Sequence, residues 1–174
     1  MKVLVVFGSK RGGTAGLASM IAHELDDAGL EAVVRSARGE PQLSDYAAVV
    51  VAGALYAGRW HRDARRFVKR HAERLATMPV WLVSSGPLDP SAATKEIPPV
   101  RQVAKLAALV GAHGQVTFGG VLQEHPKGLV ARAMARKYAG DWRDPEHVQR
   151  WAAAVASQLF AVERFTERNK ITDR

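Results

Sequence analysis

The residues best suited to chemistry lie in one short stretch near the start of the chain. An apolar run over 3–7 ends at Gly8, and helical spacing of apolar residues begins a few positions later. The residues between are Ser9, Lys10, Arg11, Gly12, Gly13 and Thr14. Free amides at a helix start, two hydroxyl groups and two glycines that let an anion approach the backbone suit a phosphate group. We therefore predict that residues 9–14 bind phosphate.

Two further loops of small residues follow apolar runs. The run 47–53 leads into the loop 53–61, and the run 80–84 leads into the loop 84–90. Continuous apolar runs of this length are typical of strands that are covered on both faces. Ligands of parallel sheets bind at the carboxyl ends of the strands, so we expect these two loops and the first to form one site.

Helices are predicted to alternate with the strands. The predicted strands are 3–7, 30–34, 47–53, 80–84 and 115–119. The predicted helices are 14–28, 62–78, a helix opened by Pro98 and Pro99 that ends near 110, and a terminal helix from Asp144 to about Val162. This alternation predicts an α/β fold, a doubly wound parallel sheet with helices on both faces, in a single domain over 1–162. The tail 163–174 contains few apolar residues and is predicted to fray.

Composition limits the class of protein. The chain has 174 residues, 47% of them hydrophobic and 24% charged, with no cysteine. Disulfides, thiolate metal sites and cysteine nucleophiles are therefore excluded, and no metal site is predicted. No apolar run approaches the roughly 20 residues that span a bilayer, and the opening run is too short for a signal peptide. We expect a cytoplasmic protein.

The net charge of +8 indicates an anionic ligand or partner. Two common nucleotide motifs are missing, because no Lys-Ser or Lys-Thr pair follows a glycine and the spacing from Gly8 to Gly13 does not fit G-x-G-x-x-G. Nucleic-acid binding is disfavoured because the basic residues are not interleaved with aromatic ones in a known reading motif.

The phosphate stretch resembles the loop of the flavodoxin family, in which a Ser or Thr, a glycine and a closing Thr directly follow the first strand. The resemblance extends over 53–61, 64–71, 79–88 and 118–122, and covers nearly the whole chain. These stretches are similar to the flavodoxin-type protoporphyrinogen IX dehydrogenase (quinone) branch and its bacterial flavodoxin-domain relatives. The resemblance implies a flavodoxin-like, five-stranded parallel sheet in the order 2-1-3-4-5 that holds flavin mononucleotide, FMN.

The resemblance also implies roles for individual residues. Ser9, Lys10, Arg11, Gly12, Gly13 and Thr14 would hold the FMN phosphate. Leu55, Tyr56, Ala57 and Gly58 would flank one side of the flavin ring, and Ser85, Gly86 and Pro87 the other. Tyr56 is the candidate for stacking on the ring. His61 lies beside the expected ring and is the candidate for moving protons.

The implied function is an FMN-dependent oxidoreductase that passes electrons from a reduced substrate to a quinone-type acceptor. Protoporphyrinogen IX, a carboxylated porphyrinogen, is the substrate that the resemblance implies. Two alternatives stay open, an electron-transfer module that serves a partner protein and an FMN-free interaction domain. The positive charge differs from that of acidic electron-carrier flavodoxins and argues against a simple carrier.

Several surface features have more than one interpretation. The basic face of the predicted helix 62–78 suits solvent, an anionic substrate or partner, or an acidic membrane. The segment 127–138 has one basic and one apolar side, which suits packing on the domain or a peripheral contact at the inner face of the membrane. His71 is predicted to lie on the surface. A homodimer is compatible with the sequence.

Overall fold

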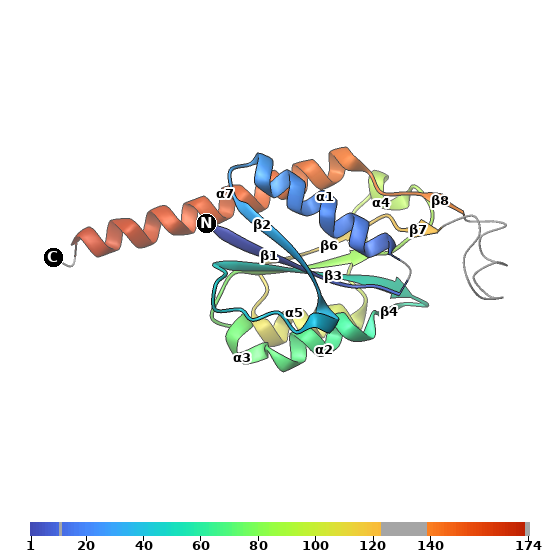
Figure 1. Cartoon of the computed structure of the whole chain (residues 1–174). Coiled ribbons are helices and arrows are strands. Elements are labelled where there is room, and N and C mark those ends of the chain that lie inside the picture. The colour runs from blue at the N-terminus through green and yellow to red at the C-terminus, as the bar shows by residue number, and fades with distance from the viewer. Residues whose placement is uncertain (11, 123–138, 173–174) are drawn as a thin grey trace.

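The main feature of the fold is a parallel sheet between two layers of helices (Figure 1). The computed structural model describes residues 1–10, 12–122 and 139–172. The strands are β1 (Lys2–Gly8), β2 (Glu31–Ser36), β3 (Ala48–Tyr56), β4 (Arg59–Trp60), β5 (Val80–Ser85), β6 (Gly114–Phe118), β7 (Val121–Leu122) and β8 (Gly140–Asp141). The helices are α1 (Gly13–Asp27), the 3₁₀ helix η1 (Ala37–Gly39), α2 (Arg62–Arg70), α3 (Ala72–Leu75), α4 (Ser91–Thr94), α5 (Arg101–Val110) and α7 (Pro145–Thr172).

Five strands pair in parallel in the order β2-β1-β3-β5-β6. In chain order these are the first to fifth predicted strands, so the predicted order 2-1-3-4-5 is confirmed. The short strand β4 pairs antiparallel with the end of β3, and β7 and β8 form a separate antiparallel pair. The α/β doubly wound architecture follows from the runs of valine, which are buried on both faces of the sheet.

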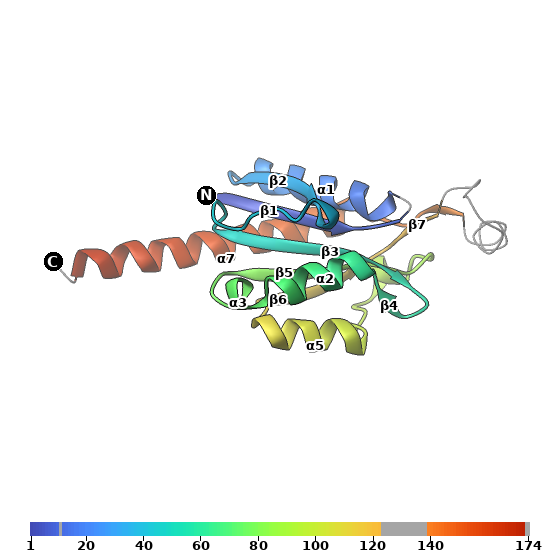
Figure 2. The same cartoon turned by 60° about the horizontal axis from the view of Figure 1, so that its bottom comes forward.

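Alternate residues of each strand belong to two hydrophobic cores. Val3 and Val5 of β1 pack into the core formed with α1 and α7, whereas Leu4 and Val6 pack into the core formed with α2, α3 and α5. Figure 2 shows the second group of helices below the sheet. Because both faces are covered, only the edges and ends of the sheet remain open to ligands.

The predicted helix 62–78 is wrong in one respect, because the structure divides it into α2 and α3. His71 separates the two helices with φ −102° and ψ 17°, and no proline or glycine marks the break. The side chain of His71 packs against Phe67 with ring centroids 4.7 Å apart and is only partly exposed. The prediction of His71 as a plain surface residue is therefore also corrected.

The helix predicted to open at Pro98 and Pro99 begins later, at Arg101. Val100 is its N-cap and has an extended backbone, with φ −62° and ψ 147°. A proline disfavours helical backbone in the residue before it, so two successive prolines delay the helix start.

The terminal helix is longer than predicted. α7 continues to Thr172, so its predicted end near Val162 is wrong. Figures 1 and 2 both show its second half extending past the sheet. Glu and Arg are good helix formers, and a helix that is already nucleated by a packed first half extends at little cost. The low apolar content after Val162 did not prevent helix formation, and Glu163, Arg164, Phe165 and Arg168 are exposed.

The start of α7 is confirmed, and it supports a prediction. Oδ1 of Asp144 accepts hydrogen bonds from the amides of Glu146 (3.0 Å) and His147 (3.3 Å). We expect Asp144→Ala to lower the free energy of unfolding by about 1 kcal/mol, because two amides lose their acceptor. Urea unfolding measures this, with Gln149→Ala on an exposed position of the same helix as control. Equal stability of the two variants would contradict the capping role.

The predicted segment 127–138 lies outside the described residues. Among the helices that the structure describes, none combines the length and the apolar character needed to cross a membrane.

Candidate functional site

A cavity of about 320 Å³ lies at the carboxyl ends of β1, β3 and β5. It is lined by Ser9, Gly13, Thr14, Ala54, Leu55, Tyr56, Ala57, Ser85, Gly86, Leu88, Gly120, Val121 and Leu122. The three loops that were predicted to converge contribute most of this lining. Of the other predicted residues, Lys10, Gly12, Gly58 and Pro87 do not line the cavity, and Arg11 lies outside the described residues.

One end of the cavity is rich in hydrogen-bond donors. Gly12 has a left-handed backbone (φ +83°), which glycine adopts without strain, and its amide donates to Oγ of Ser9 (3.2 Å). The next amides, of Gly13, Thr14 and Ala15, donate to no other residue that the structure describes. The side chain of Thr14 is buried, and its hydroxyl has no such partner either. Among the described residues, the donors at this end of the cavity, at the N-terminus of α1, therefore have no partner.

The other end is bounded by a β-hairpin, which corrects the prediction of a loop over 53–61. β3 continues to Tyr56, and Tyr56 pairs with Arg59 of β4. Ala57 and Gly58 form the two-residue turn, and both have positive φ (47° and 70°). Two positive φ angles are the requirement of a tight hairpin turn. Gly58 was interpreted as part of a loop, whereas in the structure its positive φ allows the tight turn between β3 and β4.

Tyr56 stands at the hairpin tip with 38% of its surface exposed. Across the cavity, Ser85 is buried, and its hydroxyl donates to no described residue. A Cβ on Gly86 would lie 3.0 Å from Leu55 and 3.1 Å from Thr117, so the two walls approach closely at this point. The cavity is therefore narrow at this end.

Trp60 does not line the cavity and instead packs inside the protein. It is 1% exposed, and its Nε1 donates to the carbonyl of Val83 (3.3 Å). Its indole lies directly over Gly53, where an added Cβ would come within 2.4 Å of the ring. Trp60 therefore anchors the hairpin that carries Tyr56.

Sequence reasoning missed the contribution of the segment after β6. Gly120, Val121 and Leu122 line the cavity, and a Cβ on Gly13 would lie 3.3 Å from Val121. Arg143, which pairs with Asp141, lies over Gly16 in the first turn of α1. The glycine pair at 119–120 could have predicted this contribution, because it follows the carboxyl end of the fifth strand.

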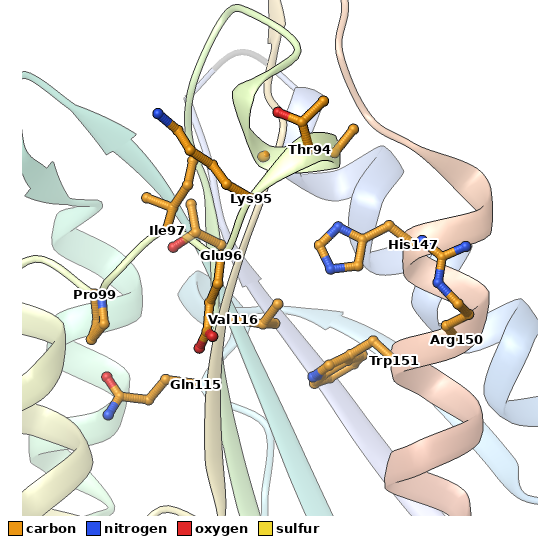
Figure 3. Close-up of a pocket in the computed structure, with 13 residues that line it drawn as sticks. Thr94, Lys95, Glu96, Ile97, Pro99, Gln115, Val116, His147, Arg150 and Trp151 are labelled. Atoms are coloured by element: carbon orange, nitrogen blue, oxygen red, sulfur yellow. The ribbon is translucent and has the colours of Figure 1, made fainter.

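A second, larger hollow of about 510 Å³ lies at the free edge of the sheet (Figure 3). His147, Arg150 and Trp151 of α7 lie on one side of β6 in this view. Lys95, Glu96 and Ile97 follow α4 on the other side. None of the predicted site residues lines this hollow.

His61 lies behind the hairpin, outside the cavity lining. Its side chain is 11% exposed, and its ring makes an edge contact with Tyr56 at 6.2 Å between centroids. As N-cap of α2, Nδ1 accepts from the amide of Asp63 at 3.3 Å. The neutral ring then carries its proton on Nε2. Burial lowers the pKa of His61 below 6.5, Arg38 acts in the same direction, and the Asp63 carboxylate opposes both.

This pKa gives an expected pH dependence of stability. The folded pKa of His61 is depressed, so the unfolded chain takes up the proton first as the pH falls below 6.5. The contribution to stability is therefore present above pH 6.5 and is lost as the pH falls through the window below it. His61→Asn keeps a capping side chain and removes the titrating group, so its stability should fall less over this window. Urea unfolding on either side of pH 6.5 tests this, and parallel curves for both proteins would contradict it.

The comparisons with known proteins identify the family. The Flavodoxin domain family matches residues 4–144, which is most of the chain. The chain belongs to the flavodoxin-domain family. Over 81 residues it is 38% identical to the protoporphyrinogen IX dehydrogenase [quinone] of Escherichia coli strain K12. That match covers 45% of this chain and 45% of that enzyme, so less than half of the relative's length is matched.

Solved structures similar to this flavodoxin-domain protein share its fold. Oxidised Flavodoxin 2 from Bacillus cereus has a TM-score of 0.60 at 19% identity, covering 91% of this chain and 99% of that chain. Rubredoxin oxygen:oxidoreductase from Desulfovibrio gigas has a TM-score of 0.64 at 15% identity, covering 92% of this chain and 36% of that chain. The family match shows a flavodoxin domain, and the partial match to the dehydrogenase supports the oxidoreductase class that is proposed below.

Proposed function

We propose that this protein is an FMN-dependent oxidoreductase and that the cavity at the carboxyl ends of β1, β3 and β5 is its FMN site. The observation that carries the proposal is the division of one cavity into a donor-rich end and a narrow end. The donor-rich end contains Ser9, Gly13 and Thr14, and the narrow end contains Tyr56 and Gly86. A phosphate ester with a planar aromatic ring has the same division.

The donor-rich end fits a phosphate by the chemistry of its groups. The hydroxyls of Ser9 and Thr14 would hold the phosphate oxygens, together with the amides of 13–15, which have no acceptor among the described residues. Lys10 and Arg11 of the same stretch would add positive charge, and Gly12 would allow the turn. Of the hydroxyl groups in this stretch, that of Ser9 already accepts a hydrogen bond from the amide of Gly12. The hydroxyl of Thr14 has no hydrogen bond to a described residue that a phosphate would have to replace.

The narrow end would position the ring. Leu55, Tyr56 and Ala57 would cover one side and Ser85 and Gly86 the other, while Gly58 would keep the hairpin turn in place. Pro87 would restrict the backbone that follows Gly86. When bound, FMN supplies a ring that accepts electrons from a reduced substrate and returns them to an acceptor.

His61 would move protons beside the ring. Burial keeps its imidazole neutral near pH 7, with the proton on Nε2. The edge contact between its ring and that of Tyr56 supports this role, because Tyr56 lines the cavity.

The substrate we propose is protoporphyrinogen IX, with a quinone as acceptor. The identity of 38% with an enzyme of that name supports this proposal, as does the excess of positive charge on the chain. The proposal puts the protein in the cytoplasm, with peripheral contact at the inner face of the membrane where quinones are found. A homodimer stays a prediction.

A second function, an electron-transfer module for a partner protein, is favoured by the shared fold of solved flavodoxins. Two experiments separate the possibilities. Absorbance of the purified protein with added FMN tests the cofactor, and the absence of flavin uptake would refute both functions in favour of an FMN-free interaction domain. Anaerobic turnover of protoporphyrinogen IX with menadione tests the enzyme, and absent turnover with the flavin bound would favour the module.

A further inference from the structure

A third hollow, of about 280 Å³, lies between η1 and α2. It is unusual in the number of arginines around it. Arg38 comes from η1, and Arg62, Arg66 and Arg70 come from successive turns of α2. Figure 1 shows the end of β2, where η1 follows, beside α2.

One buried carboxylate arranges the entrance of this arginine hollow. Asp63 is only 8% exposed and accepts from Nε of Arg38 (2.7 Å) and from Nε of Arg62 (3.5 Å). Both arginine side chains are more than half exposed, so their terminal nitrogens stay available. The hydrogen bond from Arg38 lowers the pKa of Asp63, which therefore remains ionised at neutral pH. Two guanidinium groups share one carboxylate here.

The positive charge continues along the helix. Arg66 lies one turn after Arg62 and has no acidic partner among the described residues, whereas Arg70 pairs with Glu40. Four guanidinium groups thus face two carboxylates, which leaves a net excess of two positive charges in the hollow. An uncompensated cluster of this kind attracts an anion.

His71 supplies an independent sign of a polar ligand. It lines the hollow, and its Nε2 is buried without a hydrogen-bond partner in the described structure. Buried polar atoms are nearly always satisfied, and an orphaned one at the wall of a hollow is explained by a group that enters from outside.

The arginine hollow and the proposed FMN cavity share no lining residue, but side-chain contacts connect them. The ring of Tyr56 lies 6.2 Å from that of His61, and Nδ1 of His61 lies 3.9 Å from the Asp63 carboxylate. Tyr56 of the cavity is thus linked to Arg38 and Arg62 of the hollow through His61 and Asp63.

We propose that the arginine hollow binds the carboxylate groups of a substrate whose reacting ring lies against Tyr56. This inference rests on the proposed function, because it assigns the substrate class of that site. Guanidinium groups bind carboxylates through two parallel hydrogen bonds, and the fixed fork of arginine favours a set position. The hollow selects for carboxylated, not neutral, macrocycles.

The test is binding of protoporphyrin IX, a coloured dicarboxylate, to the FMN-loaded protein in a neutral detergent. We expect Arg66→Gln to weaken binding about 10-fold, and the double variant Arg62→Gln with Arg66→Gln to weaken it further. Arg74→Gln is the matched control, because Arg74 lies on α3 outside the hollow and loses the same charge. The dimethyl ester of protoporphyrin should bind weakly to all of these proteins.

Several results would overturn the inference. These are an absence of protoporphyrin binding to the wild-type protein, equal affinity of Arg66→Gln and wild type, an equal loss in Arg74→Gln, or equal binding of the ester. Urea unfolding of each variant separates loss of binding from loss of fold. In steady-state turnover, Arg66→Gln should raise KM with little change in kcat. Flavin absorbance in the same samples distinguishes failure of the FMN proposal from failure of the arginine-hollow proposal. If the protein binds no flavin but still binds porphyrin in a way that depends on Arg66, only the FMN proposal is refuted.

Discussion

Replacing Thr14 by valine is expected to weaken FMN binding by about 10- to 100-fold, because a hydrogen bond to a charged group contributes roughly 1.5–3 kcal/mol. Valine has nearly the same shape as threonine, so the packing of this buried side chain, 2% exposed, changes little. What is lost is the hydroxyl that faces the cavity and has no partner among the described residues. The amides of the loop remain, so binding is weakened rather than abolished.

Titration of the apoprotein with FMN, followed by flavin fluorescence, measures the effect. Ser19→Ala is the matched control, because Ser19 is an exposed residue of the same helix whose hydroxyl donates to the carbonyl of Ala15. The control should bind FMN as the wild type does. If Thr14→Val also binds normally while its free energy of unfolding is unchanged, the phosphate does not lie at the N-terminus of α1.

Replacing Gly53 by alanine is expected to destabilise the protein by about 3 kcal/mol, the upper part of the range for overpacked cores. The new Cβ would lie 2.4 Å from two atoms of the Trp60 indole. That ring is 1% exposed and is held by its hydrogen bond to Val83, so it cannot rotate away freely. Gly53 also pairs in register with Gly8 and Ser84, which prevents the strand from shifting.

The same substitution should weaken FMN binding, since Trp60 anchors the hairpin that carries Tyr56. Urea unfolding gives the stability, and the FMN titration gives the affinity. Gly39→Ala is the control, because a Cβ at Gly39 meets no atom within 4 Å. That variant should be as stable as the wild type or slightly more stable. Equal stability of Gly53→Ala and Gly39→Ala would refute the anchoring role of Trp60.

The charge of the chain bears on the choice between enzyme and electron carrier. The basic face predicted for residues 62–78 is not uniform in the structure. Arg38 and Arg62 converge on the buried Asp63, whereas Arg74 bonds to Thr77 at the other end of the segment. The arginines that share the Asp63 carboxylate are therefore the ordered ones. This arrangement favours a small anionic substrate over a general attraction to acidic surfaces.

Some features could be predicted because their causes are local. Runs such as 47–53 and 80–84 are apolar at every position, and such runs are stable only as strands covered on both faces. The glycines and hydroxyl residues of 9–14 determine a turn and a helix start within a few residues, as the structure confirms in φ +83° at Gly12. The Asp144 cap was recognised for the same reason, since its hydrogen bonds reach only two and three residues ahead.

Other features depend on residues that are distant in the sequence. Glycine at 58 is compatible with a turn in a loop or in a hairpin. The structure has the hairpin, because Trp60 packs over Gly53 and donates a hydrogen bond to the carbonyl of Val83. The break at His71 likewise has no breaker residue to predict it. These outcomes depend on side-chain packing between elements, which local propensity does not encode.

The sequence by itself therefore predicted the parallel sheet and the glycine-rich turn after the first strand, and the resemblance to the flavodoxin family supplied the strand order 2-1-3-4-5. Only the tertiary structure decided what surrounds that turn. It brought Val121 against Gly13 and joined Arg38 to Asp63, which is 25 positions away in the chain. The physical reason is that crossover connections place the strand ends side by side, so a site built there collects residues whose distances no local pattern records.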